Sequence, residues 1–188
     1  MFHKSIFINF FLKIMAENAL GNIFLTGFMG SGKTTAGKKL AKLLKINFID
    51  LDNYIEQKEK LSVQSLFENF GEPAFRKMEQ VSLNELLKLK SKAVIALGGG
   101  TICYNDNLQK IKKIGLLIYI DLPPIALAQR LEKSKVKRPL LKNLKGEELV
   151  KFVTDKLEER KSYYVQSHIT ISGISLTPQL LQQKISEK

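Results

Sequence analysis

The sequence predicts an α/β fold of three layers, in which helices cover both faces of a five-stranded parallel sheet. Short apolar and β-branched runs alternate with helical patterns, and the expected strands are residues 22–26, 46–50, 93–97, 116–121 and 168–171. Strands separated by helices are joined by crossovers, which give a parallel sheet buried on both faces. Right-handed crossovers place the carboxyl ends of all strands at one edge, where we expect the ligands to bind.

A glycine-rich loop follows the first expected strand and precedes a helical pattern over residues 35–45. Its sequence is G-F-M-G-S-G-K-T, residues 27–34. Glycines allow a tight turn, so that successive N–H groups and the positive end of the next helix point at one anion. Lys33 is suited to reach the outer phosphates, and the Thr34 hydroxyl is suited to coordinate a Mg²⁺ that bridges them. The sequence therefore predicts a P-loop that binds a nucleoside triphosphate with Mg²⁺, through Gly30, Ser31, Gly32, Lys33, Thr34 and Thr35.

The length of 188 residues suits a single domain. Residues 21–188 are expected to form it, with two accessory segments. Residues 52–89 are predicted to hold two or three helices, with breaks near residues 61–62 and 71–73, and to cover a substrate. Residues 133–145 are basic, contain Pro139 and are typical of a mobile lid that closes over a phosphate.

The first 20 residues are expected to be an extension outside the fold. Lys4 is followed by an apolar run over residues 6–12, which loosely imitates a secretory signal and which Lys13 ends. The run is too short to span a membrane, and export would separate an ATP-dependent enzyme from its nucleotide. We expect residues 1–14 to be dispensable, because Met15 lies just ahead of the first strand.

The net charge of +12 fits either a nucleic-acid partner or a site for ATP and an acidic small molecule. An aromatic stacking motif, zinc-ligand spacing and a recognition helix are all missing from the sequence, which argues against nucleic acid. Cys103 is the single cysteine, so an internal disulfide is impossible and a reducing cytoplasm fits. We expect Cys103 to be a small buried hydrophobic residue, and His3 and His168 to be structural or exposed.

Two aspartates close the second expected strand. If the extended backbone continues past Asp50, then Asp50 and Asp52 face the same side. One carboxylate could then hold Mg²⁺ while the other accepts the proton of an attacking hydroxyl. The alternative is a solvated turn or a helix cap. Asp121 ends another apolar strand and is a rival metal ligand, but the two prolines that follow favour a loop or cap role.

Arg76 and Glu79 are three residues apart on an expected helix and lie on one face. A glutamate can fix the direction of a guanidinium, which then grips a carboxylate through two hydrogen bonds. The alternative is an exposed pair that adds little to stability. Gly98, Gly99 and Gly100 follow the third expected strand, where three glycines allow backbone N–H groups to approach a ligand closely.

Six segments in this order resemble the shikimate kinase family. They are G-F-M-G-S-G-K-T-T, F-I-D-L-D, F-R-K-M-E, G-G-G, R-P-L-L and R-K-S-Y-Y, and the match runs from residue 22 to residue 171. The resemblance implies a nucleoside-monophosphate-kinase-like P-loop fold and transfer of the γ-phosphate of ATP to the 3-hydroxyl of shikimate. It also implies a cytoplasmic enzyme of aromatic amino acid biosynthesis, which we expect to be a monomer.

The resemblance also implies roles for single residues. Asp52 would bind the hydroxyls of shikimate and act as the base, and Gly98, Gly99 and Gly100 would line the site. Arg76, oriented by Glu79, and Arg160 would clamp the carboxylate. Lys33 and Arg138 would act on the phosphates, and the cation of Arg138 would offset charge during transfer. Thr34 and Asp50 would serve the Mg²⁺.

Two points stay open at this stage. Arg130 and Lys133 compete for the role of the arginine that contacts adenine in the family, and residues 172–178 are the candidate adenine loop. The alternative functions are another small-molecule kinase of the same fold, such as a gluconate kinase, and an NTP-gated nucleic-acid-binding protein. The first has no need of two arginines for a ring carboxylate, and the second is supported only by the basic charge.

Overall fold

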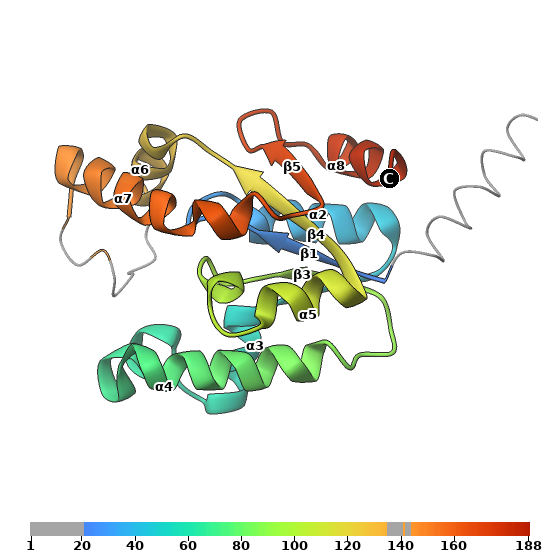
Figure 1. The fold of residues 1–188 in the computed structure, drawn as a ribbon, viewed down its shortest axis with the longest axis horizontal. Coiled ribbons are helices and arrows are strands. Elements are labelled where there is room, and N and C mark those ends of the chain that lie inside the picture. The colour runs from blue at the N-terminus through green and yellow to red at the C-terminus, as the bar shows by residue number, and fades with distance from the viewer. Residues whose placement is uncertain (1–20, 135–140, 142–143) are drawn as a thin grey trace, which may run out of the picture.

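The computed structural model describes residues 21–188 except 135–140 and 142–143. Five parallel strands form one sheet in the order β2-β3-β1-β4-β5, and helices lie on both sides of it (Figure 1). The strands are β1 (Asn22–Thr26), β2 (Asn47–Asp50), β3 (Ala93–Ala96), β4 (Gly115–Asp121) and β5 (Ile169–Ser172). The predicted five-stranded parallel sheet is confirmed, and each strand lies within one residue of its expected bounds.

Seven α-helices and one short 3₁₀ helix occur within the described residues. They are α2 (Lys33–Leu44), α3 (Leu51–Glu59), α4 (Val63–Leu86), η1 (Thr101–Cys103), α5 (Asn107–Ile114), α6 (Pro124–Glu132), α7 (Gly146–Tyr164) and α8 (Pro178–Ser186). In this part of the chain no helix combines the length and the apolar character needed to cross a bilayer.

Alternating residues of the central strands belong to two separate hydrophobic clusters, one on each face of the sheet. On β1, Phe24 points to a cluster shared with α3, α4, α5 and Tyr164 of α7. Its neighbours Ile23 and Leu25 point to the other face, where α2 and α8 pack. Both faces are therefore covered, which explains why the strands read as continuous apolar runs.

Helix α4 contains the break that the sequence predicted. Gly71 has φ 75° and ψ 170°, which is not a helical conformation, so α4 consists of two segments joined by a kink. A glycine tolerates this positive φ at little cost. The second segment starts at Glu72 and carries Arg76 and Glu79, so the kink sets the direction from which both side chains reach the edge of the sheet.

Candidate functional site

The P-loop connects β1 to α2 at the carboxyl edge of the sheet. Gly30 and Gly32 adopt φ values of 83° and 97°, the left-handed region that the tight turn requires. The Lys33 ammonium donates to the carbonyls of Gly27 at 2.8 Å and Phe28 at 3.0 Å. It thus lies across the loop, and the α2 N-terminus opens toward the same edge, which is the geometry that binds phosphate.

Thr34 and Asp50 meet beside the loop. The Thr34 hydroxyl donates to Asp50 Oδ2 at 2.7 Å. Asp50 is also the N-cap of α3, because its Oδ1 accepts from the backbone N–H of Asn53 at 3.4 Å. The helix-cap interpretation is therefore correct for Asp50, and it is compatible with the pairing to Thr34.

The expectation of an extended backbone through Asp52 is wrong. Helix α3 begins at Leu51, directly after the strand, so Asp52 lies in the first turn of the helix. Both carboxylates nevertheless line the same cavity. The cause of this convergence is the helix start, which turns Asp52 toward the glycine turn after β3, where an added Cβ on Gly98 would lie 3.2 Å from Asp52 Oδ1.

Arg76 and Glu79 form a buried pair, so the exposed alternative is excluded. Arg76 Nη1 donates to Glu79 Oε2 at 2.8 Å, and the Thr101 hydroxyl donates to Glu79 Oε1 at 2.6 Å. Glu79 is 1% exposed and Arg76 is 9% exposed. Burial works to lower the pKa of Arg76, but the ion pair with Glu79 and the hydrogen bonds to Glu79 and Glu72 together outweigh it, so the pKa is raised.

Two further residues that the sequence analysis did not single out also hold Arg76. Glu72 Oε1 accepts from Arg76 Nε at 3.2 Å, from Arg76 Nη2 at 2.8 Å and from the Tyr104 hydroxyl at 2.9 Å. The guanidinium carbon of Arg76 lies 4.2 Å from the centre of the Tyr104 ring. The spacing of four residues between Glu72 and Arg76 could have predicted their pairing on one helix face. The position of Tyr104, in contrast, depends on the tertiary fold.

The glycine turn after β3 is enclosed by the side chains of the site. A Cβ added to Gly98 would lie 2.7 Å from Glu79 Oε1, and one added to Gly100 would lie 3.0 Å from Arg76 Nη2. The backbone of Gly99 is fixed from the other side, since the Tyr164 hydroxyl donates to its carbonyl at 2.5 Å. A side chain at Gly98 would therefore displace Glu79, and one at Gly100 would press against Arg76.

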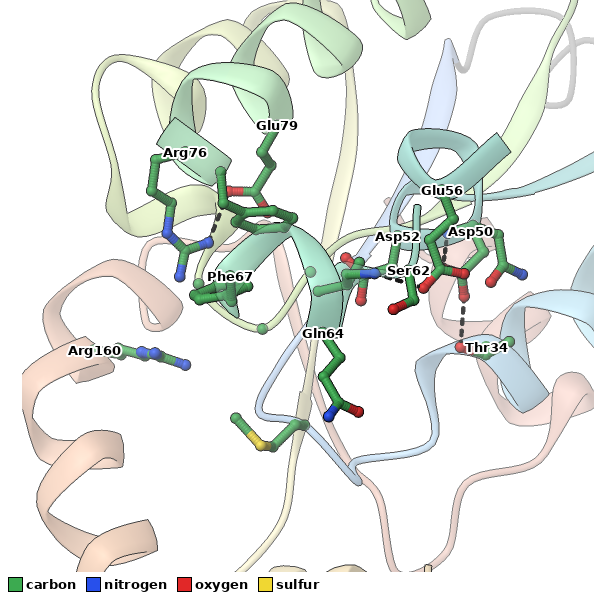
Figure 2. A pocket seen from close by; sticks show the side chains of 17 residues that line it. Thr34, Asp50, Asp52, Glu56, Ser62, Gln64, Phe67, Arg76, Glu79 and Arg160 are labelled. Atoms are coloured by element: carbon green, nitrogen blue, oxygen red, sulfur yellow. Dashed lines mark hydrogen bonds and ion pairs between the residues drawn. The ribbon is translucent and has the colours of Figure 1, made fainter. Parts of the chain in front are cut away.

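Arg160 reaches the same space from α7. It is 8% exposed, and its guanidinium carbon lies 5.5 Å from the centre of the Phe28 ring of the P-loop. Figure 2 shows Arg76 and Arg160 on one side of the pocket and Thr34 and Asp50 on the other. The pocket therefore has a P-loop residue and a carboxylate on one side and two arginines on the other.

This pocket is a cavity of about 500 Å³. It brings together the predicted residues Thr34, Asp50, Asp52, Arg76, Gly98, Gly99, Gly100 and Arg160. Met29, Phe67 and Phe75 form an apolar part of its lining that was not predicted. An aromatic residue at helical spacing, such as Phe67 or Phe75, does not by itself reveal whether it faces a core or a ligand.

A second cavity of about 230 Å³ lies against the other side of the P-loop and is lined by Ser31, Gly32, Thr35, Lys39, Arg130, Gly173 and Thr177, among others. The Arg130 guanidinium donates to the carbonyls of Ser31 and Gly173, both at 3.3 Å. Lys133 ends α6 and is not among the described residues that line this cavity. The geometry thus favours Arg130 over Lys133 beside the loop at residues 172–178.

Asp121 is the last residue of β4, where its Oδ1 accepts from the Tyr119 hydroxyl at 2.8 Å. The expected loop or cap role is wrong, because the N-cap of α6 is Pro123. Among the described residues, those that line the two cavities do not include Asp121. Asp50 is therefore the better-placed of the two rival metal ligands.

Two other sequence expectations concern residues outside this site. Cys103 is half-buried against the core, and burial raises the pKa of its thiol to about 11, so it is a packing residue rather than a nucleophile. His168 is structural, since its Nδ1 accepts from the backbone N–H of Leu117 at 2.9 Å. Arg138, most of the predicted lid, His3 and the N-terminal 20 residues lie outside the described residues.

Comparisons with known proteins agree with this geometry. A family model described as shikimate kinase matches residues 29–188. The shikimate kinase of Parabacteroides distasonis is 43% identical over 151 residues, which cover 80% of this chain and 87% of that protein. The structure of shikimate kinase from Acinetobacter baumannii in complex with shikimate superposes with a TM-score of 0.79 at 39% identity, covering 88% of this chain and 90% of that one.

A more distant likeness bears on the fold alone. A gluconokinase structure from Sinorhizobium meliloti superposes with a TM-score of 0.55 at 12% identity, covering 89% of this chain and 90% of that one. Since the family model spans most of the chain and the two relatives named above are 43% and 39% identical, the comparisons agree with the resemblance found in the sequence. The chain belongs to the shikimate kinase family.

Proposed function

We propose that this protein transfers the γ-phosphoryl group of ATP to the 3-hydroxyl of shikimate, giving shikimate 3-phosphate and ADP. The observation that carries the proposal is the cavity of about 500 Å³, which places Thr34 of the P-loop, Asp52 and two buried arginines around one volume. A phosphate donor and a carboxylate-bearing acceptor bound there would be neighbours. Positioning of that kind supplies much of the catalysis in phosphoryl transfer.

Arg76 and Arg160 hold the carboxylate of the substrate in this proposal. Both side chains are nearly buried, so water screens their charge only weakly. Phe67 and Phe75 supply apolar walls on which a six-membered ring can lie. The Acinetobacter baumannii relative was solved with shikimate bound, which supports the choice of acceptor.

Asp52 acts as the general base. It lines the cavity between the P-loop end and the arginine end, where the attacking hydroxyl must lie. A carboxylate in that position accepts the hydroxyl proton and orients the oxygen in line with the γ-phosphate. Lys33 stabilises the outer phosphates. As the family resemblance implies, Arg138 acts on the phosphates, and its cation offsets charge during transfer.

The proposal assigns Mg²⁺ to Thr34 and Asp50. Their oxygens, 2.7 Å apart, are the hard donors that Mg²⁺ prefers. Among the described residues, no group of three or more His, Cys, Asp or Glu side chains is placed to hold a metal ion by itself. Mg²⁺ needs only one or two carboxylates, together with water and phosphate. When bound, the ion neutralises charge on the transferring phosphate.

The second cavity is the proposed adenine site, with Arg130 against it. We also propose that the protein is a monomer in the cytoplasm and does not bind nucleic acid. A nucleic-acid binder would lose affinity steeply between low and moderate salt, so binding of single- and double-stranded oligonucleotides at two salt concentrations tests that rival function.

A coupled ADP-release assay with shikimate, quinate and gluconate tests the proposed function. We expect Mg²⁺-dependent turnover that is highest with shikimate, because the two arginines match a ring carboxylate and Phe67 and Phe75 line the cavity. Equal turnover of gluconate would support the alternative kinase. ADP release without an acceptor, together with salt-sensitive oligonucleotide binding, would support an NTP-gated binding protein.

A further inference from the structure

We propose that Tyr104 is a positioning residue for substrate recognition, which holds Arg76 in the orientation that grips a carboxylate. This inference rests on the proposed function. Tyr104 follows η1, on the segment that begins with the glycine turn, whereas Arg76 belongs to α4. Arg76 and Tyr104 are 28 residues apart in the sequence, so their contact joins two elements that only the fold brings together.

Tyr104 contacts Arg76 in two ways. Its ring lies 4.2 Å from the guanidinium carbon, which is a cation–π contact. Its hydroxyl donates at 2.9 Å to Glu72 Oε1, the same oxygen that accepts from Arg76 Nε and Nη2. The ring thus fixes the plane of the guanidinium, and the hydroxyl fixes the carboxylate that holds one of its edges.

The Tyr104 hydroxyl matters because Glu72 is the more exposed of the two carboxylates that hold Arg76. The Glu72 side chain is 40% exposed whereas that of Glu79 is 1% exposed, and an exposed carboxylate loses side-chain entropy when it is held in one geometry. Burial works to raise the pKa of Glu72, but hydrogen bonds from Arg76 and Tyr104 outweigh it and lower the pKa. Glu72 therefore stays charged while Tyr104 holds it in place.

The arrangement determines which N–H groups of Arg76 face a ligand. A guanidinium has five N–H groups. Within the described residues, Glu72 accepts from one on Nε and one on Nη2, and Glu79 accepts from one on Nη1. One N–H remains on each terminal nitrogen, which is the number that a single carboxylate needs for two hydrogen bonds. Because the orientation exists before binding, the substrate does not lose affinity by ordering Arg76.

The test compares three variants in the full-length enzyme. Tyr104→Leu removes ring and hydroxyl, Tyr104→Phe removes only the hydroxyl, and Tyr54→Phe is the matched control. The Tyr54 hydroxyl also donates to a glutamate of α4, Glu85 at 3.0 Å, but Tyr54 is not among the described residues that line the cavity. KM for shikimate, KM for ATP, kcat and Tm are measured for each.

We expect KM for shikimate to rise about tenfold in Tyr104→Leu and about threefold in Tyr104→Phe, with KM for ATP within twofold of the unmodified enzyme. Tyr54→Phe should change neither constant by more than about twofold. The carboxamide of shikimate provides a second readout. Tyr104→Leu should weaken the binding of shikimate far more than the binding of its carboxamide, because the amide lacks the charge and the second acceptor oxygen that Arg76 recognises.

Parallel increases in both KM values, or equal weakening of acid and amide, would overturn the inference and make Tyr104 a merely structural residue. If Tyr104→Leu does not fold, an unchanged KM for shikimate in Tyr104→Phe overturns it. Absence of shikimate turnover in the unmodified enzyme would overturn the proposed function as well. Normal turnover with an unchanged Tyr104→Leu variant would overturn this inference alone.

Discussion

The Thr34 hydroxyl donates to Asp50 Oδ2 at 2.7 Å, which joins the first turn of α2 to the end of β2. The two residues come from neighbouring βα connections, and the parallel sheet brings both to its carboxyl edge. Both oxygens belong to side chains, so neither takes part in the backbone pairing of the sheet. The pair is therefore a place where the predicted Mg²⁺ role can be tested separately from the fold.

Asp50→Asn is expected to raise the Mg²⁺ concentration for half-maximal activity about tenfold or more, because a neutral amide is a weaker ligand than a carboxylate. Asparagine is also a good N-cap, so α3 should keep its start and Tm should change little. Titration of Mg²⁺ at saturating ATP and shikimate measures the effect. An unchanged Mg²⁺ dependence would remove Asp50 from the metal site, and Asp121→Asn would then be examined as the rival.

Asp52→Asn is expected to lower kcat by roughly 10² or more while leaving ATP binding nearly intact, because an amide cannot accept the hydroxyl proton. Calorimetric binding of ATP and steady-state kinetics with shikimate separate the two effects. Asp52 is in the first turn of α3 and half-buried, so the isosteric change should not unfold the helix. Turnover at the original rate would exclude Asp52 as the base.

Arg76→Lys is expected to raise KM for shikimate by about tenfold or more and to leave KM for ATP nearly unchanged. A lysine keeps the charge but loses the planar fork that bonds to both carboxylate oxygens and to Glu72 and Glu79 together. Measuring both constants in one assay tests this. Equal increases for the acid and for ATP would mean that Arg76 supports the whole site rather than the carboxylate.

His168 is expected to make stability fall as the pH is lowered. Burial lowers the pKa of His168 from the ordinary value of 6.5, and its Nδ1 accepts from the N–H of Leu117, which a protonated ring cannot do. A histidine with a lowered pKa in the folded state contributes stability that is complete above pH 6.5 and is lost as the pH falls below it.

The variant His168→Asn offers a side-chain oxygen to the same N–H but does not titrate in this range. The difference in free energy of unfolding between the two proteins should therefore change from pH 8 to pH 5, with the unmodified protein losing more. Urea unfolding at several pH values gives this difference. A constant difference would show that protonation of His168 is not coupled to folding.

Deletion of residues 1–14 is expected to leave kcat, both KM values and Tm within error, because the predicted domain starts at residue 21. The full chain and the shortened chain are compared in the same kinetic assay and thermal melt. A fall of many degrees in Tm would mean that these residues belong to the folded domain.

Much of the fold followed from local patterns. The five apolar runs, separated by helical periods, predicted the strands to within a residue, because strands that helices cover on both faces consist mainly of apolar residues. The P-loop was equally readable, since its glycines and Lys33 must have fixed spacing to form the turn. The break at Gly71 was visible because glycine and proline stand together there.

The details of the site depended on neighbours that are distant in the sequence. The start of α3 at Leu51 was not predicted, because a carboxylate such as Asp50 is as compatible with an extended strand end as with a helix cap. Burial of Arg76 and Glu79 could not be separated from an exposed pair by spacing alone. Arg130 and Lys133 were equivalent in sequence, and only the packing of α6 against the P-loop placed Arg130 next to Ser31 and Gly173.

The sequence by itself determined the layered sheet, the phosphate loop and the set of charged residues available at one edge, because backbone periodicity and turn geometry are encoded locally. Only the tertiary structure decided which of those charges share a cavity and which residues orient them. Tyr104 illustrates the reason, since its contact with Arg76 exists because the sheet brings the segment after β3 against α4. Contacts between distant segments are set by packing, which a single sequence read residue by residue does not specify.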